Sequence, residues 1–179
     1  MLRLCRFLGL RGNEALHVRA DTLVRWKIEL NTTGEILVAA GTKGGRKRTV
    51  KVLHPESALR AIEFAKEAMA SSDFLITRAN LRQVEGLKQA RSIWHSWVFR
   101  HGIKPHSLRY AFAHAQFAAY IARNFSEREA LASLSLDLGH GDGRGRWVKS
   151  VYLSGHACEK PVTRNNDAAI TGPNPEIPE

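Results

Sequence analysis

The residues that could do chemistry in this 179-residue chain gather between His106 and Tyr152. His106 and Arg109 form a His-x-x-Arg pair, His140 follows a glycine, and Tyr152 closes the stretch. Cations neutralise phosphate oxygens, imidazoles move protons, and a phenol can act as a nucleophile. The stretch therefore indicates attack on a phosphodiester, although His106 and Tyr152, each taken singly, are better explained as structural residues of a helix.

The net charge indicates the same class of partner. The chain has 27 Lys and Arg residues against 17 Asp and Glu residues, which gives a net charge of +10. A domain this basic is typical of proteins that bind a polyanion, most often nucleic acid. The alternative is a soluble protein that is basic without such a partner, and we favour nucleic acid.

Several other classes of protein are disfavoured. No apolar run approaches the roughly 18 residues that a membrane span needs, and the charged N-terminus is unlike a signal peptide. Two distant cysteines, Cys5 and Cys158, do not make a disulfide scaffold. His140, His156 and Cys158 lack the fourth ligand of a zinc site. We expect a cytoplasmic protein with no membrane partner, associated with the bacterial nucleoid if it binds DNA.

The predicted fold class is α+β, a mostly helical domain with a small three-stranded antiparallel sheet near the N-terminus. Alternating residues and intervening turns predict strands over 25–30, 35–40 and 47–53. Helical spacing, a proline at a helix start and a capping box predict the helices. The first predicted helix is short and follows Gly9-Leu10. The other predicted helices span about 55–70, 80–100, 106–123, 126–134 and 147–153.

Two basic turns are candidates for DNA contacts. The turn before the third predicted strand carries Lys43, Arg46, Lys47 and Arg48 without an acid among them. It lacks the glycine spacing of a Walker loop, so we interpret it as a mobile hairpin that reaches over a phosphate backbone. A solvated charged turn is the alternative. The second turn is rich in glycine, lacks a dinucleotide fingerprint, and carries Arg144 and Arg146.

Two other features are weaker signals. Arg11 near a helix start could help to bind an anion, but alone it is better explained as an exposed partner of Glu14. Trp94 and Trp97 could stack on bases, but aromatic residues at helical spacing belong more often to a core.

In their order along the chain, these motifs resemble the catalytic domain of tyrosine recombinases, the phage integrase family. The resemblance covers about residues 8–153. It rests on Gly9-Leu10-Arg11-Gly12-Asn13-Glu14-Ala15-Leu16, Lys43-Gly44-Gly45-Arg46-Lys47, the His-x-x-Arg pair, Leu138-Gly139-His140 and the final tyrosine. The catalytic residues that it implies are Arg11, Lys43, His106, Arg109, His140 and Tyr152.

The resemblance implies site-specific recombination or integration of a mobile element. Tyr152 would attack the phosphodiester and form a 3′-phosphotyrosyl link, while the arginines bind the phosphate and Lys43 protonates the leaving 5′ oxygen. Religation then needs neither metal nor ATP, because the link conserves the bond energy. The partner is double-stranded DNA, and a homo-tetramer on DNA is left open. The DNA contacts would come from Arg46, Lys47, Arg48, Arg144 and Arg146.

Two departures from the family pattern shape the expected organisation. The interval from His140 to Tyr152 is longer than usual, and Arg11 lies almost at the start, where family members have a DNA-clamping domain before it. We expect a catalytic domain over 1–153 without that clamping domain, and a disordered tail over 154–179. The alternative function is a non-catalytic DNA-binding remnant of a truncated integrase. A type IB topoisomerase is disfavoured by the small size and the Leu-Gly-His motif.

Overall fold

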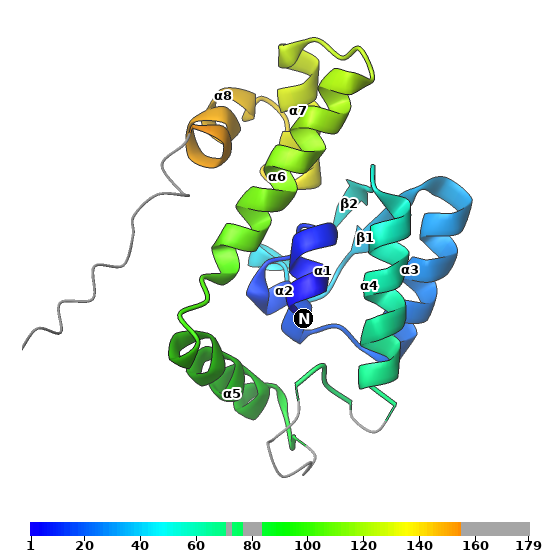
Figure 1. The fold of residues 1–179 in the computed structure, drawn as a ribbon, viewed down its shortest axis with the longest axis vertical. Coiled ribbons are helices and arrows are strands. Elements are labelled where there is room, and N and C mark those ends of the chain that lie inside the picture. Colours follow the sequence, from blue (N-terminus) through cyan, green and yellow to red (C-terminus); the bar gives the residue numbers. More distant parts are fainter. Residues whose placement is uncertain (71–72, 77–83, 155–179) are drawn as a thin grey trace, which may run out of the picture.

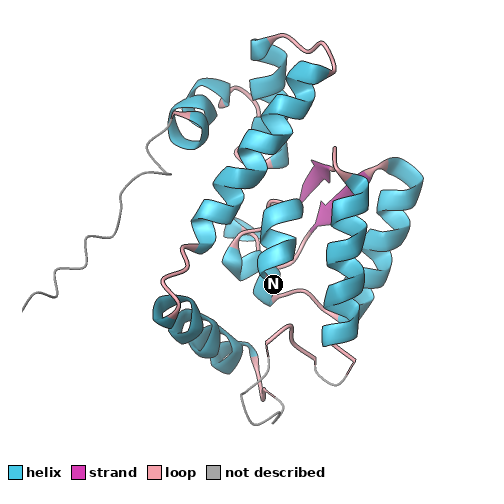
Figure 2. Cartoon of the chain, in the orientation of Figure 1, coloured by secondary structure: helices cyan, strands magenta, loops and turns pink. Residues whose placement is uncertain are grey.

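A computed structural model of the chain describes residues 1–70, 73–76 and 84–154. Within these ranges, eight α-helices surround a two-stranded sheet, which confirms a mostly helical fold (Figures 1 and 2). The α-helices are α1 (Leu2–Phe7), α2 (Gly12–Leu16), α3 (Ala20–Thr33), α4 (Pro55–Ala68), α5 (Leu87–Arg100), α6 (Pro105–Ala122), α7 (Glu127–Asp137) and α8 (Gly145–Val148). A short 3₁₀ turn, η1 (Lys43–Gly45), and a π-helical turn, η2 (Lys149–Leu153), complete the elements. None of the helices in these ranges could span a membrane.

The sheet has two strands where three were predicted. Strands β1 (Glu35–Val38) and β2 (Arg48–Lys51) pair antiparallel, with Ile36 opposite Val50. The first predicted strand, over 25–30, is instead the second half of α3. In this segment Trp26, Ile28 and Leu30 alternate with polar residues, which imitates a strand. The prediction was wrong because a strand would place all three apolar side chains on one face, whereas Trp26 and Leu30 are buried and Ile28 is 59% exposed.

Helical spacing explains why α3 forms. Leu23, Trp26 and Leu30 lie three and four residues apart and are all buried, so they form one apolar face. The Trp26 indole donates a hydrogen bond from Nε1 to the Leu37 carbonyl at 2.8 Å, which fixes the helix to β1. Gly34 ends the helix in the left-handed conformation, with φ of 72°.

The other helical predictions mostly agree with the structure. The proline-initiated helix is α4, the His-x-x-Arg helix is α6, and α7 follows its capping box but continues to Asp137. The predicted helix over 147–153 is α8 followed by η2. Of the helix predicted over 80–100, residues 80–83 lie outside the described residues, as does the predicted tail from residue 155 onward.

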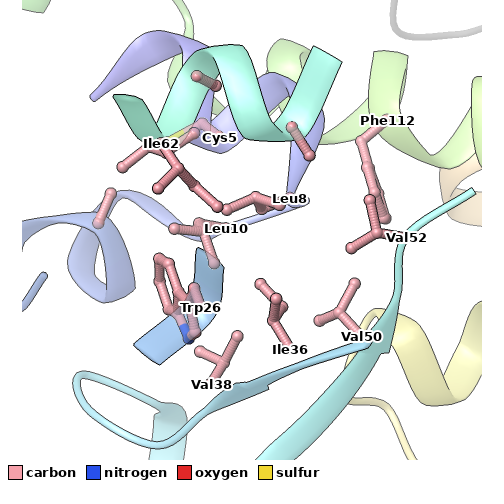
Figure 3. Packing of buried hydrophobic residues seen from close by; sticks show 14 of the residues in the cluster. Cys5, Leu8, Leu10, Trp26, Ile36, Val38, Val50, Val52, Ile62 and Phe112 are labelled. Carbon is pink, nitrogen blue, oxygen red and sulfur yellow. The ribbon is translucent and has the colours of Figure 1, made fainter. Parts of the chain in front are cut away.

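The main core joins the N-terminal helices to α6. Side chains from α1, α3, α4, α6 and both strands meet in one apolar cluster, whose centre Figure 3 shows. Gly9 lies where this core is tightest, because a Cβ atom there would approach the Phe112 ring to 2.5 Å and its φ is +60°. The close contact between the segment after α1 and α6 therefore requires glycine at this position.

A buried carboxylate, Asp137, fixes the end of α7 to the sheet and to α6. Its Oδ1 atom accepts the backbone N–H of Lys51 at 3.0 Å. Its Oδ2 atom accepts the Gln116 amide and the Tyr120 hydroxyl, both at 2.8 Å. Burial raises the pKa of Asp137, although these three donors act in the opposite direction. The motif Leu138-Gly139-His140 begins directly after this anchor.

Replacing Asp137 tests the anchor. Asp137→Ala leaves up to three buried donors without an acceptor, so we expect the free energy of unfolding to fall by about 2–4 kcal/mol. The control is Asp142→Ala, since Asp142 is exposed and, among the described residues, accepts only the neighbouring Gly143 N–H. The control should change stability by less than about 1 kcal/mol. Urea denaturation followed by circular dichroism measures both, and equal losses would contradict the anchor role.

Candidate active site

A fully buried arginine, Arg109, lies at the centre of the candidate site. It is in the second turn of α6 and is 0% exposed. Its guanidinium donates to the carbonyl oxygens of Gly9 and Leu138, and its Nε atom donates to the Tyr152 hydroxyl at 3.2 Å. Burial, followed by the nearby charge of Arg48, lowers the pKa of Arg109 to about 10, so it remains charged at neutral pH. One side chain thus joins four segments that are distant in sequence.

Tyr152 lies on η2 with its hydroxyl between Arg109 and His140. The hydroxyl oxygen is 3.2 Å from Arg109 Nε and 3.2 Å from His140 Nε2. Because Arg109 donates to this oxygen, the phenol's own proton is free to point at the imidazole. The ring packs against Tyr110 with centroids 5.0 Å apart, and the residue is 5% exposed.

The charge of the site keeps the His140 imidazole neutral. Burial, then the charges of Arg109 and Arg11, lower the pKa of His140 to about 4. A neutral imidazole nitrogen can accept a hydrogen bond, so His140 Nε2 can accept one from the Tyr152 hydroxyl. His106 lies at the surface on the first turn of α6, with its ring against Tyr110 at 5.8 Å. Its pKa is also lowered, by partial burial and then by the same two arginines.

A second buried group, Glu14, organises two further arginines. It accepts the backbone N–H of Arg11 at 2.7 Å, the Arg11 Nη1 group at 2.8 Å and the Arg48 Nη2 group at 2.8 Å. Burial acts to raise the pKa of Glu14, but the hydrogen bond and charge of Arg48 prevail and hold it below the usual value. Arg11 also donates to the Leu138 carbonyl at 3.1 Å and remains partly exposed. Glu14 thereby fixes Arg11 next to the segment that carries His140.

The structure corrects the position predicted for Arg48. The sequence suggested a surface contact with DNA, but Arg48 is buried, with 7% exposure. Besides Glu14, it donates to the carbonyl oxygens of Gly9 and Asp137. The sequence did contain a signal for this: Arg48 and Val50 are two residues apart, so both point to the same, inner face of β2.

Close packing on Arg48 explains the glycine of Leu138-Gly139-His140. Gly139 has φ of +67°, and a Cβ atom there would lie 2.5 Å from Arg48 Cδ. The backbone must therefore run directly over the buried arginine before it presents His140. Glycine is needed here both for its conformation and for its lack of a side chain.

The remaining predicted cations lie on the surface. Lys43, Arg46 and Lys47 are exposed in and after η1, and Arg144 and Arg146 are exposed beside α8. Within the described ranges, the side chains of these five residues form no ion pair or hydrogen bond. The structure thus gathers Arg11, Arg109, His140 and Tyr152 in one region. His106 reaches this region by its ring contact with Tyr110, which in turn packs against Tyr152. Lys43 lies apart from these residues.

Sequence reasoning did not single out three contributors to this site. Glu14 and Asp137 act by holding the arginines and the His140 segment, and Trp147 packs its ring against His140 with centroids 4.5 Å apart. No group of three or more His, Cys, Asp or Glu that could hold a metal ion occurs in the described part of the chain.

Comparison with known proteins gives one match. A family model described as Integrase matches residues 1–115, which is more than half of the chain. The matched span includes Arg11, Lys43, His106 and Arg109, and it ends before His140 and Tyr152. No curated protein and no solved structure matches the chain.

Substituting glycines tests the packing of Gly139 on Arg48. Gly139→Ala introduces both a strained φ and a clash with a buried charged side chain, so we expect a loss of about 3 kcal/mol or more in the free energy of unfolding. Gly143→Ala is the matched control, since its φ is +74° and nothing lies within 4 Å of the added Cβ. It should lose only about 1–2 kcal/mol, from the backbone alone. Similar losses in denaturant titrations of the two variants would show that the contact with Arg48 is unimportant.

The lowered pKa of His140 can be measured directly. We expect the His140 imidazole to take up its proton near pH 4 in a titration followed by NMR. In Arg11→Gln the loss of one nearby positive charge should raise the pKa of His140, and burial should still hold it below the ordinary value of about 6.5. Arg60→Gln, an exposed substitution on α4, serves as the control and should leave the titration unchanged. Protonation of wild-type His140 near pH 6.5 would contradict this electrostatic description.

Proposed function

Because the chain belongs to the phage integrase, or tyrosine recombinase, family, we propose that it performs site-specific DNA recombination or integration through a covalent link between Tyr152 and DNA. Membership of the family indicates DNA integration or recombination in general. The observation that supports the chemistry is the Tyr152 hydroxyl, which lies 3.2 Å from both Arg109 Nε and His140 Nε2. A phenol in this position has a donor at Arg109 and an acceptor at His140 within hydrogen-bond distance of its hydroxyl oxygen.

The proposed cleavage is a transesterification. The Tyr152 oxygen attacks the scissile phosphorus while its proton passes to His140 Nε2, and the bond from phosphorus to the 5′ oxygen breaks. Lys43 gives its proton to the leaving oxygen when the exposed hairpin closes over the DNA. The products are a 3′-phosphotyrosyl link and a free 5′-hydroxyl. Attack by a 5′-hydroxyl of another strand reverses each step and releases the phenol. Because one phosphodiester bond is exchanged for another in both steps, the proposed reaction needs neither metal nor ATP.

The arginines supply the electrostatic part of this mechanism. Arg11 is partly exposed, so it and His106 meet an incoming phosphate first. Arg109 is behind Tyr152 and gains access to the nonbridging oxygens when the phenol moves toward phosphorus. Guanidinium groups held in place by Glu14 and by backbone carbonyls do not need to reorganise as charge develops on those oxygens.

The DNA-contacting surface of the proposal consists of the exposed cations on two turns. Lys43, Arg46 and Lys47 lie on the hairpin, and Arg144 and Arg146 lie next to the His140 segment. Their charges suit contacts with phosphates on either side of the scissile bond. A full exchange cuts and rejoins four strands in two duplexes, so we propose that four copies act together on DNA in the nucleoid.

The second candidate function is DNA binding without cleavage. It is favoured by the burial of Arg109 and Tyr152, which are 0% and 5% exposed, because a phosphate cannot reach either group in this arrangement. The two functions share salt-sensitive DNA binding and differ in whether a covalent product forms.

Covalent trapping separates the two functions. Incubation with a nicked duplex, in which the short fragment carrying the 5′-hydroxyl diffuses away, should give a protein–DNA adduct that survives SDS. Tyr152→Phe should abolish the adduct. Tyr110→Phe is the matched control, since it removes a hydroxyl from the neighbouring ring that touches Tyr152, and it should still form the adduct. Salt-sensitive DNA binding with no adduct from the wild type would establish the non-catalytic function instead.

A further inference from the structure

An exposed tryptophan, Trp147, touches both partners of the proposed proton transfer. Its ring centroid is 4.5 Å from that of His140 and 6.1 Å from that of Tyr152. The rings of His140 and Tyr152 are themselves 5.7 Å apart, so the three form a compact aromatic cluster. Trp147 lies in the long interval between His140 and Tyr152.

The backbone on either side of Trp147 is fixed. Val148 is fully buried in the main core, and its N–H donates to the Arg144 carbonyl at 2.9 Å. On the other side, a Cβ atom at Gly145 would be 3.2 Å from Leu131, so α8 lies closely on α7. The indole itself is 42% exposed. It is therefore held rigidly without being part of the core.

The His140 imidazole has few hydrogen bonds that could fix the orientation of its ring. Histidines that act in catalysis are commonly oriented by a hydrogen bond at the second ring nitrogen. Among the described residues, His140 has one ring hydrogen bond, to the Tyr152 hydroxyl, and none at Nδ1. A single hydrogen bond lets a ring rotate about the donor–acceptor line, and the ring contact with Trp147, the closer of the two aromatic contacts of His140, opposes that rotation.

We propose that Trp147 is a positioning residue, whose indole holds the His140 imidazole in line with the Tyr152 hydroxyl. This inference rests on the proposed strand cleavage for its effect on rate, but the contact that it describes can be tested without activity. Trp147 acts through His140 and takes no part in the bond changes.

The chain contains a matched control on another helix. Trp97 on α5 is 39% exposed and stacks on His101 with ring centroids 4.5 Å apart, so it repeats the Trp–His contact on a helix that carries none of the proposed catalytic residues, and it also stacks on Trp94. Trp97→Leu therefore removes a similar exposed indole and a similar contact, and leaves the Tyr152 cluster intact.

The first experiment measures adduct formation on the nicked duplex in a single turnover. At saturating DNA, Trp147→Leu should slow adduct formation about tenfold, which is the size expected for the loss of an aromatic pair, and should leave the Kd for DNA within about twofold. Trp147→Phe should restore most of the rate because it keeps a ring beside His140. Trp97→Leu should match the wild type. A weaker Kd with an unchanged rate constant would overturn the proposal, since it would make Trp147 a DNA contact.

The second experiment uses NMR and free protein. Nuclear Overhauser contacts between the His140 and Tyr152 rings, and the ring-current shift of the His140 protons, should be lost in Trp147→Leu and kept in Trp147→Phe. Their persistence in folded Trp147→Leu would overturn the proposal. If Trp147→Leu and Trp147→Met both fail to fold, the indole is a core residue and the proposal is also wrong. If wild-type protein forms no adduct, strand cleavage fails, and the NMR comparison still decides what holds the ring of His140.

Discussion

The candidate site depends on how three guanidinium groups share one buried acid. Arg11 and Arg48 both bind Glu14, and Arg109 lies close enough for its charge to lower the pKa of the same carboxyl. One carboxylate cannot balance three cations, so most of the remaining stabilisation comes from neutral carbonyl oxygens at Gly9, Leu138 and Asp137. Burying a charge against neutral dipoles is costly, and each of the three guanidinium groups offsets this cost by donating to several fixed oxygens.

This positive charge adds to the effect of burial on the neighbouring groups. Burial is the main cause of the lowered pKa of Arg109, His140 and His106, and the nearby arginine charges lower each of them further. A phosphate diester would bring the missing negative charge, so the electrostatics of the free protein fit the proposed substrate independently of any motif.

The sequence predicted that Arg11, Arg109, His140 and Tyr152 act together, and their catalytic role stays a prediction. In the structure Tyr152 contacts Arg109 and His140, and Arg11 binds the Leu138 carbonyl, two residues before His140. The strand over 25–30 was wrong because three apolar residues alternate there by chance, and only packing against the sheet shows that Ile28 is outside the core.

Two further features depend on contacts across the chain. The spacing of Arg48 and Val50 indicates that Arg48 faces inward, but Arg48 meets Glu14 and Gly139 only after β2, α2 and the end of α7 have assembled. In the same way, the contact between Trp147 and His140 depends on the path of the loop between them, which the spacing alone does not define. The chemical types of the site residues were thus visible in the sequence, whereas the partners that hold them were not.

The hydrogen bond between Arg109 and Tyr152 gives the free protein a closed arrangement that DNA is suited to open. In this arrangement the phenol oxygen is the neutral acceptor at Arg109 Nε. A phosphate oxygen is charged, and hydrogen bonds between two charged groups are stronger than bonds to a neutral acceptor. Under the proposed function, a phosphate would therefore replace the phenol at Arg109 and release Tyr152 beside the phosphorus that it is proposed to attack. Burial of the nucleophile is then compatible with catalysis, because the substrate itself displaces the group that must move.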